Sequence, residues 1–152
     1  MRPFLKALKQ FDGQVLTNEL CFTIEGELIR HGLYRPMIRS KEVVAKWVDF
    51  EPLDDVEVTK ILNDNPQDHK EAGFDRGWPS RFDTHYALMK RFGFVFYRVG
   101  EAIRFSELGN MFVEMTPEEN GDSVFKYDEE LIFLNSFVKY HRRNPDRKST
   151  RL

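Results

Sequence analysis

Cysteine is almost absent from this sequence: Cys21 is the single cysteine among 152 residues. One cysteine can build neither a disulfide framework nor a CxxC redox or zinc motif. We therefore expect Cys21 to be a small buried apolar residue in a protein of a reducing compartment.

Long hydrophobic runs are also missing, as are internal repeats and low-complexity segments. No apolar run approaches the roughly 18 residues of a membrane-spanning helix, and the first residues lack the pattern of a signal peptide. We expect a cytoplasmic protein without a membrane partner.

The sequence offers little for catalysis or metal binding. A magnesium-dependent nuclease of the PD-(D/E)xK type needs two acids at strand ends and a lysine two residues after the second acid. The nearest match combines Asp54 or Asp55 with Asp68 and Lys70, but these residues fall on a predicted helix and in a loop. This match is the kind of triplet that a chain rich in acids and lysines contains by chance.

Other catalytic patterns are equally incomplete. Ser80, Asp83 and His85 could be combined into a triad, but no nucleophile elbow surrounds the serine, and Gly73 and Gly77 lack the Gly-Lys-Ser/Thr of a phosphate loop. None of the four histidines has a partner at zinc-ligand spacing: His31, His69, His85 and His141. We expect no catalytic residue, no metal ligand and no cofactor in this chain.

The sequence is rich in hydrophobic residues, and its charge is distributed unevenly along the chain. Hydrophobic residues make up 41% and include 14 Phe, enough for the dense core of one domain despite 32% charged residues. Residues 139–152 hold six Lys and Arg and one Asp, a charge of +5, which leaves −7 on residues 1–138 of a chain with net charge −2. A basic end on an acidic body is typical of a nucleic-acid contact, and the alternative is a solvated terminus.

Periodicity and capping signals predict a chain of short helices interrupted by one β-hairpin. The expected helices cover about 2–11, 17–31, 40–48, 54–64 and 79–92, with a further helix capped by Ser106 and a last one over 125–138. The hairpin covers 94–105, and residues 63–78 form a long loop of the kind that is often functional.

This order predicts an α+β, mostly helical winged-helix domain. Helix 54–64 and helix 79–92 would form the helix-turn-helix, and the hairpin over about 94–105 would be the wing. The domain would cover residues 1–143, followed by a basic tail at 144–152.

The outer side of helix 79–92 is the candidate DNA-reading surface, since the second helix of a helix-turn-helix lies in the major groove. Its inward residues would be Phe82, Tyr86, Met89 and Phe92. Its outward residues would be Ser80, Arg81, Thr84, His85 and Arg91, with Arg81 aimed at a guanine edge. Phosphate contacts would come from Lys90, Arg98, Arg104, Lys139, Arg142 and Arg143. The alternative is an ordinary solvated face.

Several stretches resemble a known family in the right order. They are RPFLKALKQFDG at 2–13, GWPSRFDT at 77–84 with LMKRFGFV at 88–95, IRFSELG at 103–109, and FLNSFVKY at 133–140 with Asn144-Pro145. Together they resemble the DNA-recognition region of the AlwI-like type IIS restriction endonucleases.

The resemblance implies sequence-specific binding to double-stranded DNA as the recognition part of a restriction-modification enzyme. Members of that family are type II site-specific deoxyribonucleases, and they carry a magnesium-dependent nuclease module after the recognition region. We expect that module to be absent from this chain, which would then be a fragment that binds DNA without cutting it. Two alternatives remain open: a winged-helix transcriptional regulator or protein-interaction domain, and a stand-alone nuclease acting through Asp55, Asp68 and Lys70.

Overall fold

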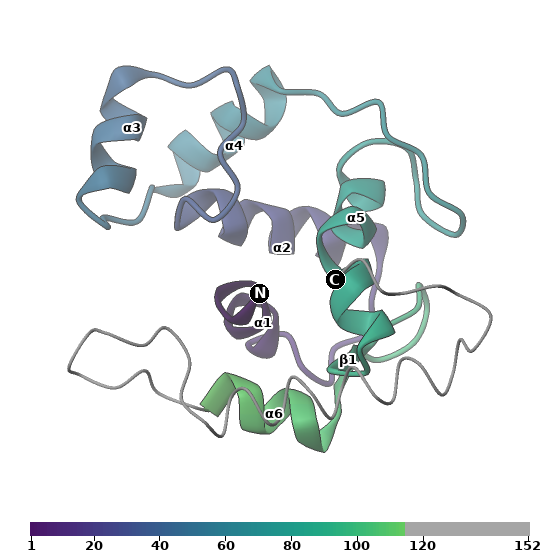
Figure 1. Cartoon of the computed structure of the whole chain (residues 1–152). Helices are drawn as coiled ribbons and strands as arrows, with labels where there is room; N and C mark the ends of the chain where they lie inside the picture. Colours follow the sequence, from purple (N-terminus) through teal and green to yellow (C-terminus); the bar gives the residue numbers. More distant parts are fainter. Residues whose placement is uncertain (115–152) are drawn as a thin grey trace, which may run out of the picture.

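The computed structural model describes residues 1–114, and within them it is a mostly helical fold with one small antiparallel hairpin (Figure 1). The elements are α1 (Arg2–Lys9), α2 (Asn18–Arg30), α3 (Lys41–Val48), α4 (Asp55–Asp64), α5 (Trp78–Arg91), β1 (Val95–Phe96), β2 (Arg104–Phe105) and α6 (Glu107–Glu114). The α+β, mostly helical class is therefore as expected. The predicted helix at 125–138 and the basic tail lie outside the described residues. No helix within residues 1–114 is long and apolar enough to cross a membrane.

Side-chain caps set the helix starts where the sequence predicted them. Thr17 accepts a hydrogen bond from the Leu20 amide at 3.0 Å, and Ser40 accepts one from the Val43 amide at 3.2 Å. Asp54 and Glu57 form a reciprocal capping box at the start of α4. Each cap satisfies amides that the first helical turn leaves without a partner.

Helix α2 lies at the centre of the fold, and α1, α4 and α5 all pack against it. The largest of these contacts is with α5, whose inner residues Phe82, Tyr86, Met89 and Phe92 are buried as predicted. Cys21, on the inner side of α2, is also fully buried. This main core also receives side chains from α1, the hairpin and α6.

A second, smaller core joins α3 and α4 to the far end of α2, on the side of the molecule opposite β1 and α6 (Figure 1). Its buried members are Ile29, Val43, Trp47, Leu53, Val58, Ile61 and Trp78. The Trp47 indole donates a hydrogen bond to the Ile29 carbonyl at 2.8 Å, and the Trp78 indole donates one to the Leu62 carbonyl at 3.1 Å. Trp78 is therefore a packing residue at the entry to α5.

The hairpin is shorter than predicted. Val95 pairs with Phe105 and Phe96 with Arg104, but the chain between them leaves this ladder. Its backbone groups bond to residues 13–16 instead: the Ile103 carbonyl accepts from Gly13 at 2.8 Å, and the Ile103 amide donates to Gln14 at 2.9 Å. Two more bonds join Leu16 to Glu101 and Gly100. The hairpin is thus tied to the segment between α1 and α2.

The predicted helix-turn-helix pair was wrong, because the observed packing pairs α5 with a different helix. We expected helix 54–64 to be the partner of helix 79–92, but α5 packs mainly on α2. Helices α3 and α4 and the loop at 65–77 form an insertion between these two partners (Figure 1). Chain order misleads here because the apolar face of α4 packs in the second core, where α5 contributes its first residue, Trp78.

Candidate nucleic-acid interface

The start of α5 is buried, and this overturns part of the predicted outer face. The Ser80 hydroxyl accepts a hydrogen bond from the Glu71 amide at 3.1 Å and donates one to the Asp75 carbonyl at 2.6 Å. Its side chain is fully buried under the 65–77 loop. The prediction that Ser80 faces outward was wrong, because this loop folds back over the first turn of the helix.

Arg81 is held against the protein rather than directed into solvent. Its Nε and Nη2 donate to the Gln67 side-chain oxygen at 3.0 and 2.7 Å. Its guanidinium lies 6.0 Å from the centre of the Tyr34 ring, within cation–π range. With two donors committed to Gln67, Arg81 is only half-exposed and does not project freely toward a base edge.

His85 points toward α2, so its predicted outward direction was also wrong. Its Nδ1 lies 2.9 and 3.0 Å from the two carboxylate oxygens of Glu25, which is fully buried. Its ring packs against Tyr34 at a centroid distance of 4.7 Å and against Phe4 at 6.0 Å. Burial raises the pKa of Glu25, while the hydrogen bond and charge of His85 and the charge of Arg81 act in the opposite direction.

The exposed side of α5 contains Thr84, Leu88, Lys90 and Arg91. Thr84, Leu88 and Arg91 are spaced four and three residues apart, so they form one ridge along the helix. Leu88 is 45% exposed. This α5 ridge is the part of the predicted surface that faces outward, and Leu88 is a member that the sequence did not single out.

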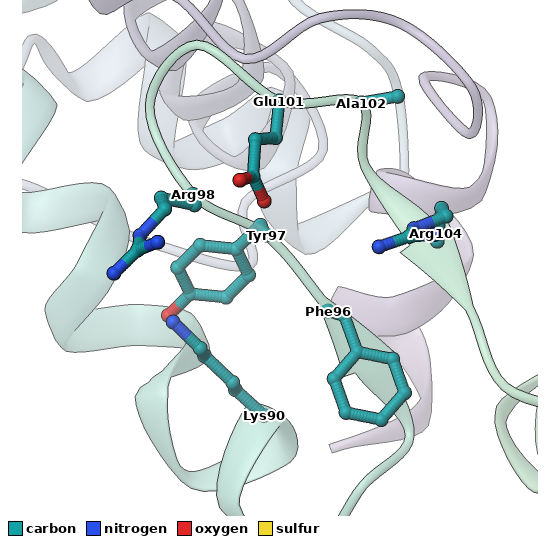
Figure 2. A pocket seen from close by; sticks show the side chains of 7 residues that line it. All are labelled: Lys90, Phe96, Tyr97, Arg98, Glu101, Ala102 and Arg104. Atoms are coloured by element: carbon teal, nitrogen blue, oxygen red, sulfur yellow. The ribbon is translucent and has the colours of Figure 1, made fainter.

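Beside the last turn of α5, the hairpin forms a shallow hollow of about 320 Å³ (Figure 2). We call it the hairpin hollow. It is lined by Lys90, Phe96, Tyr97, Arg98, Glu101, Ala102 and Arg104. Figure 2 shows Lys90 reaching from α5 to the Tyr97 ring, and Nζ lies 4.6 Å from the ring centre. Three of the predicted phosphate-contacting residues therefore meet around one hollow.

The floor of the hairpin hollow is fixed by Tyr97. Its hydroxyl donates to Asp83 on α5 at 2.7 Å, and the ring packs edge-on against Phe82 at 4.9 Å. Burial and the neighbouring Asp83 raise the pKa of Tyr97 well above its ordinary value, so the phenol remains a neutral donor.

Several cations elsewhere in residues 1–114 are ion-paired, unlike the three that line the hairpin hollow. Lys9, Lys46, Lys60 and Arg76 each form an ion pair with a nearby acid, at 2.7 to 3.1 Å. Among the described residues, no carboxylate lies within ion-pair distance of Lys90, Arg98 or Arg104. Glu101 lies between the two arginines and is the one acid among the described residues that lines the hollow. The hollow therefore presents uncompensated positive charge.

Three arginines near Pro36, namely Arg30, Arg35 and Arg39, form contacts within the protein. Arg30 forms ion pairs with Glu27 at 2.9 Å and with Asp55 at 2.5 Å. Arg35 and Arg39 donate to backbone carbonyls at the end of α2 and in the loop that follows. Arg30 is thus held by two carboxylates, whereas Arg35 and Arg39 remain exposed.

The acids considered for a nuclease site are likewise occupied. Asp55 is bonded to Arg30, Asp68 pairs with Arg76 at 3.1 Å, and the Lys70 amine donates to the carbonyls of Glu71 and Phe74. In the described part of the chain, no three His, Cys, Asp or Glu residues gather in a way that could hold a metal ion. Lys139, Arg142 and Arg143 lie outside the described residues.

The sequence analysis did not identify Glu25 and Gln67. These two residues bond to His85 and Arg81 and hold their side chains against the protein. Glu25 lies four residues from both Cys21 and Ile29, which are buried, so helical spacing placed it on the inner side of α2. Gln67 lies in an irregular loop, where periodicity gives no direction for a side chain.

The chain matches no protein-family model, no curated protein and no solved structure.

Proposed function

We propose that this chain binds double-stranded DNA through a winged-helix domain, with α5 as the recognition helix and the hairpin as the wing. The observation that carries the proposal is the group of Lys90, Arg98 and Arg104 around the hairpin hollow, without carboxylate partners among residues 1–114. Cations that are free of internal ion pairs are available to neutralise phosphates and release counterions. Their place beside the exposed ridge of α5 supports a surface that contacts backbone and bases together.

The helix arrangement supports a winged helix in revised form. Helices α2 and α5 would be the helix-turn-helix pair, with residues 31–77 inserted between them. The segment at 13–16, bonded to residues 100–103, would complete the small sheet at the base of the wing.

Base contacts would come from the α5 ridge rather than from Arg81. Thr84 and Leu88 offer methyl groups of the kind that contact the thymine methyl, and Arg91 offers a fork of donors for guanine. Lys90, Arg98 and Arg104 would contact phosphates and fix the register without specifying sequence.

The larger assignment rests on the motifs at 77–84 and 88–95 that resemble AlwI-like type IIS restriction endonucleases. Under it, this chain is the recognition part, and a separate nuclease module supplies Mg²⁺-dependent cleavage. The chain alone would then bind its site and leave plasmid DNA intact over hours with Mg²⁺ present. Nicking that disappears in Asp68→Ala would overturn this part of the proposal.

Phosphate binding is tested by fluorescence anisotropy with a random-sequence duplex. Arg98→Ala and Arg104→Ala should each weaken binding and lower the salt slope by about one unit. Lys41→Ala is the matched control, since Lys41 is an exposed cation at the start of α3 and loses the same charge. An equal loss in the control would show that net charge, and not the hairpin hollow, governs binding.

Base recognition is tested on a site selected from randomised duplexes. Leu88→Ala should cost about 1–3 kcal/mol on the selected site and little on random DNA. Met111→Ala on α6 is the matched control, because both side chains are 45% exposed. If no site is enriched, or if both variants bind it like the parent, α5 is not a recognition helix.

A protein-interaction or regulatory domain is the second candidate. The observation that favours it is Phe50, which is 94% exposed.

A further inference from the structure

The residue that follows the C-cap of α3 differs in type from the residue at the same position in two other helices. Helices α2, α3 and α5 each end in a Schellman motif, in which the residue after the C-cap adopts a left-handed conformation. In α2 that residue is Gly32 at φ 69°, and in α5 it is Gly93 at φ 79°. In α3 it is Phe50 at φ 57°.

Hydrogen bonds fix Phe50 in this conformation. Its amide donates to the Trp47 carbonyl at 3.3 Å, and the next amide, of Glu51, donates to the Lys46 carbonyl at 2.8 Å. A bulky side chain in the left-handed region is sterically unfavourable. Within residues 1–114, Phe50 is the one residue other than glycine with a positive φ.

Packing within residues 1–114 does not offset this cost. The Phe50 side chain is 94% exposed, more than any other large hydrophobic side chain among the described residues. Val48 and Val56, which flank the loop, are 62% and 77% exposed. Strain at an exposed aromatic residue indicates a role in contact with another molecule.

The surroundings of Phe50 define the chemistry of that contact. Residues 49–55, which we call the acidic loop, have the sequence DFEPLDD and contain Asp49, Glu51, Asp54 and Asp55. All four acids are exposed, but Asp55 pairs with Arg30 and Asp54 caps α4, so Asp49 and Glu51 beside Phe50 carry the charge that a partner would meet. A complementary surface must therefore be cationic, with apolar or aromatic groups at its centre.

The hairpin hollow has this character. Its floor is the ring of Tyr97 and its edge carries Phe96, and among the described residues three cations, Lys90, Arg98 and Arg104, line it against one acid, Glu101. The acidic loop and the hairpin lie on opposite sides of the molecule (Figure 1), so one chain cannot bring its own two surfaces together.

We propose that the acidic loop of one copy docks on the hairpin hollow of a second copy, with Phe50 entering the hollow between the cations. Such a contact joins two different surfaces, so it is head-to-tail and leaves one loop and one hollow unoccupied in a dimer. Two small surfaces of this kind give weak, salt-sensitive association. This inference goes beyond DNA binding and does not depend on it.

The test uses the full chain and sedimentation velocity at low salt over a concentration series. The parent should associate as its concentration rises, and added salt should reverse the association. Phe50→Gly removes the docking side chain and leaves the hollow intact, whereas Arg98→Glu reverses a charge in the hollow and leaves the loop intact. Each variant alone should remain monomeric, with unchanged circular dichroism.

Mixing the two variants gives the decisive result. The Phe50→Gly chain contributes an intact hollow and the Arg98→Glu chain an intact loop, so the mixture should form a one-to-one complex that stops at the dimer. Two outcomes overturn the proposal: a mixture that stays monomeric, and single variants that associate as well as the parent does.

The test also separates the other possible occupant of the acidic loop, the basic residues 139–152 of the same chain. A parent that stays monomeric at every concentration, and associates only after those residues are deleted, would overturn the proposal in favour of that occupant. A failure to bind DNA would leave the association unchanged, so the two proposals fail separately.

Discussion

The imidazole of His85 on α5 bonds through Nδ1 to both carboxylate oxygens of Glu25 on α2, at 2.9 and 3.0 Å, in the interface between the two helices. Glu25 is fully buried, and His85 retains 13% side-chain exposure. The contact between α2 and α5 therefore includes an ionisable pair among apolar residues, and its stability should depend on pH.

Glu25→Gln should change that pH dependence. Burial raises the pKa of Glu25 above 4.5, so the folded state retains a proton that the unfolded state has already released. The contribution of Glu25 to stability is complete below pH 4.5 and declines as pH rises through the raised pKa. Glutamine does not titrate, so the free energy of unfolding of the variant should rise relative to that of the parent as pH increases above about 4.5. Urea unfolding at a series of pH values measures this shift.

His85→Ala is the companion variant. It removes the hydrogen bond that lowers the pKa of Glu25, so the window of declining stability should extend to higher pH. It also leaves the buried Glu25 carboxyl without its hydrogen-bond partner, which costs about 1–3 kcal/mol. If the free energy of unfolding of each variant relative to the parent does not change with pH, Glu25 does not titrate in this range.

Arg81→Ala should lower stability rather than change base preference. The guanidinium holds Gln67 with two hydrogen bonds and lies over Tyr34, so its loss should cost about 1–2 kcal/mol. Arg91→Ala, on the exposed ridge of the same helix, is the matched control and should leave the melting temperature nearly unchanged. If Arg81→Ala keeps full stability and loses preference at one base pair, the predicted guanine contact is correct and the inward role is not.

Phe50→Gly should stabilise the isolated protein by about 0.5–1 kcal/mol. Glycine relieves the steric cost of the left-handed conformation, which exceeds the entropy that glycine loses on folding. Phe50→Ala separates the two effects, because alanine removes the exposed ring but keeps the strained backbone. It should give no gain in thermal unfolding, and an equal gain in both variants would show that the ring itself is destabilising.

The Cys21 thiol should react only when the protein unfolds. Burial, together with the charges of Glu25 and Asp83, raises the pKa of Cys21 to about 12, so almost no thiolate exists at neutral pH. Labelling with a thiol reagent over a urea series should therefore follow the unfolding transition seen by circular dichroism. Rapid labelling in the absence of urea would show that α2 opens locally.

The local elements were predictable because their signals are local. Thr17, Ser40, Asp54 and Ser106 precede helices that begin within a residue of the predicted positions, since a cap acts on amides two or three residues away. The inward side of α5 followed from its spacing in the same way.

The pairings at long range were not predictable. Nothing in Gln14-Val15-Leu16 distinguishes a segment that bonds to residues 100–103, because three residues are too few to show an alternating pattern. The inward turn of Arg81 and His85 depends on Gln67 and Glu25, which come from other segments. A helix with a partner on one side has one buried stripe, but α5 is covered by both α2 and the 65–77 loop.

The bonds between residues 13–16 and 100–103 also impose an order on synthesis. A ribosome adds about 5–20 residues per second, so roughly 90 residues separate these partners by about 4 to 18 seconds. During that interval α1 and the inner side of α2 lack the hairpin that covers them. The smaller core from Ile29 to Trp78 is complete earlier in the nascent chain, because its members lie within one continuous stretch. The insertion between α2 and α5 can thus fold first. Helix α1 and the inner side of α2 are synthesised earlier, but they are covered only after the hairpin has been synthesised.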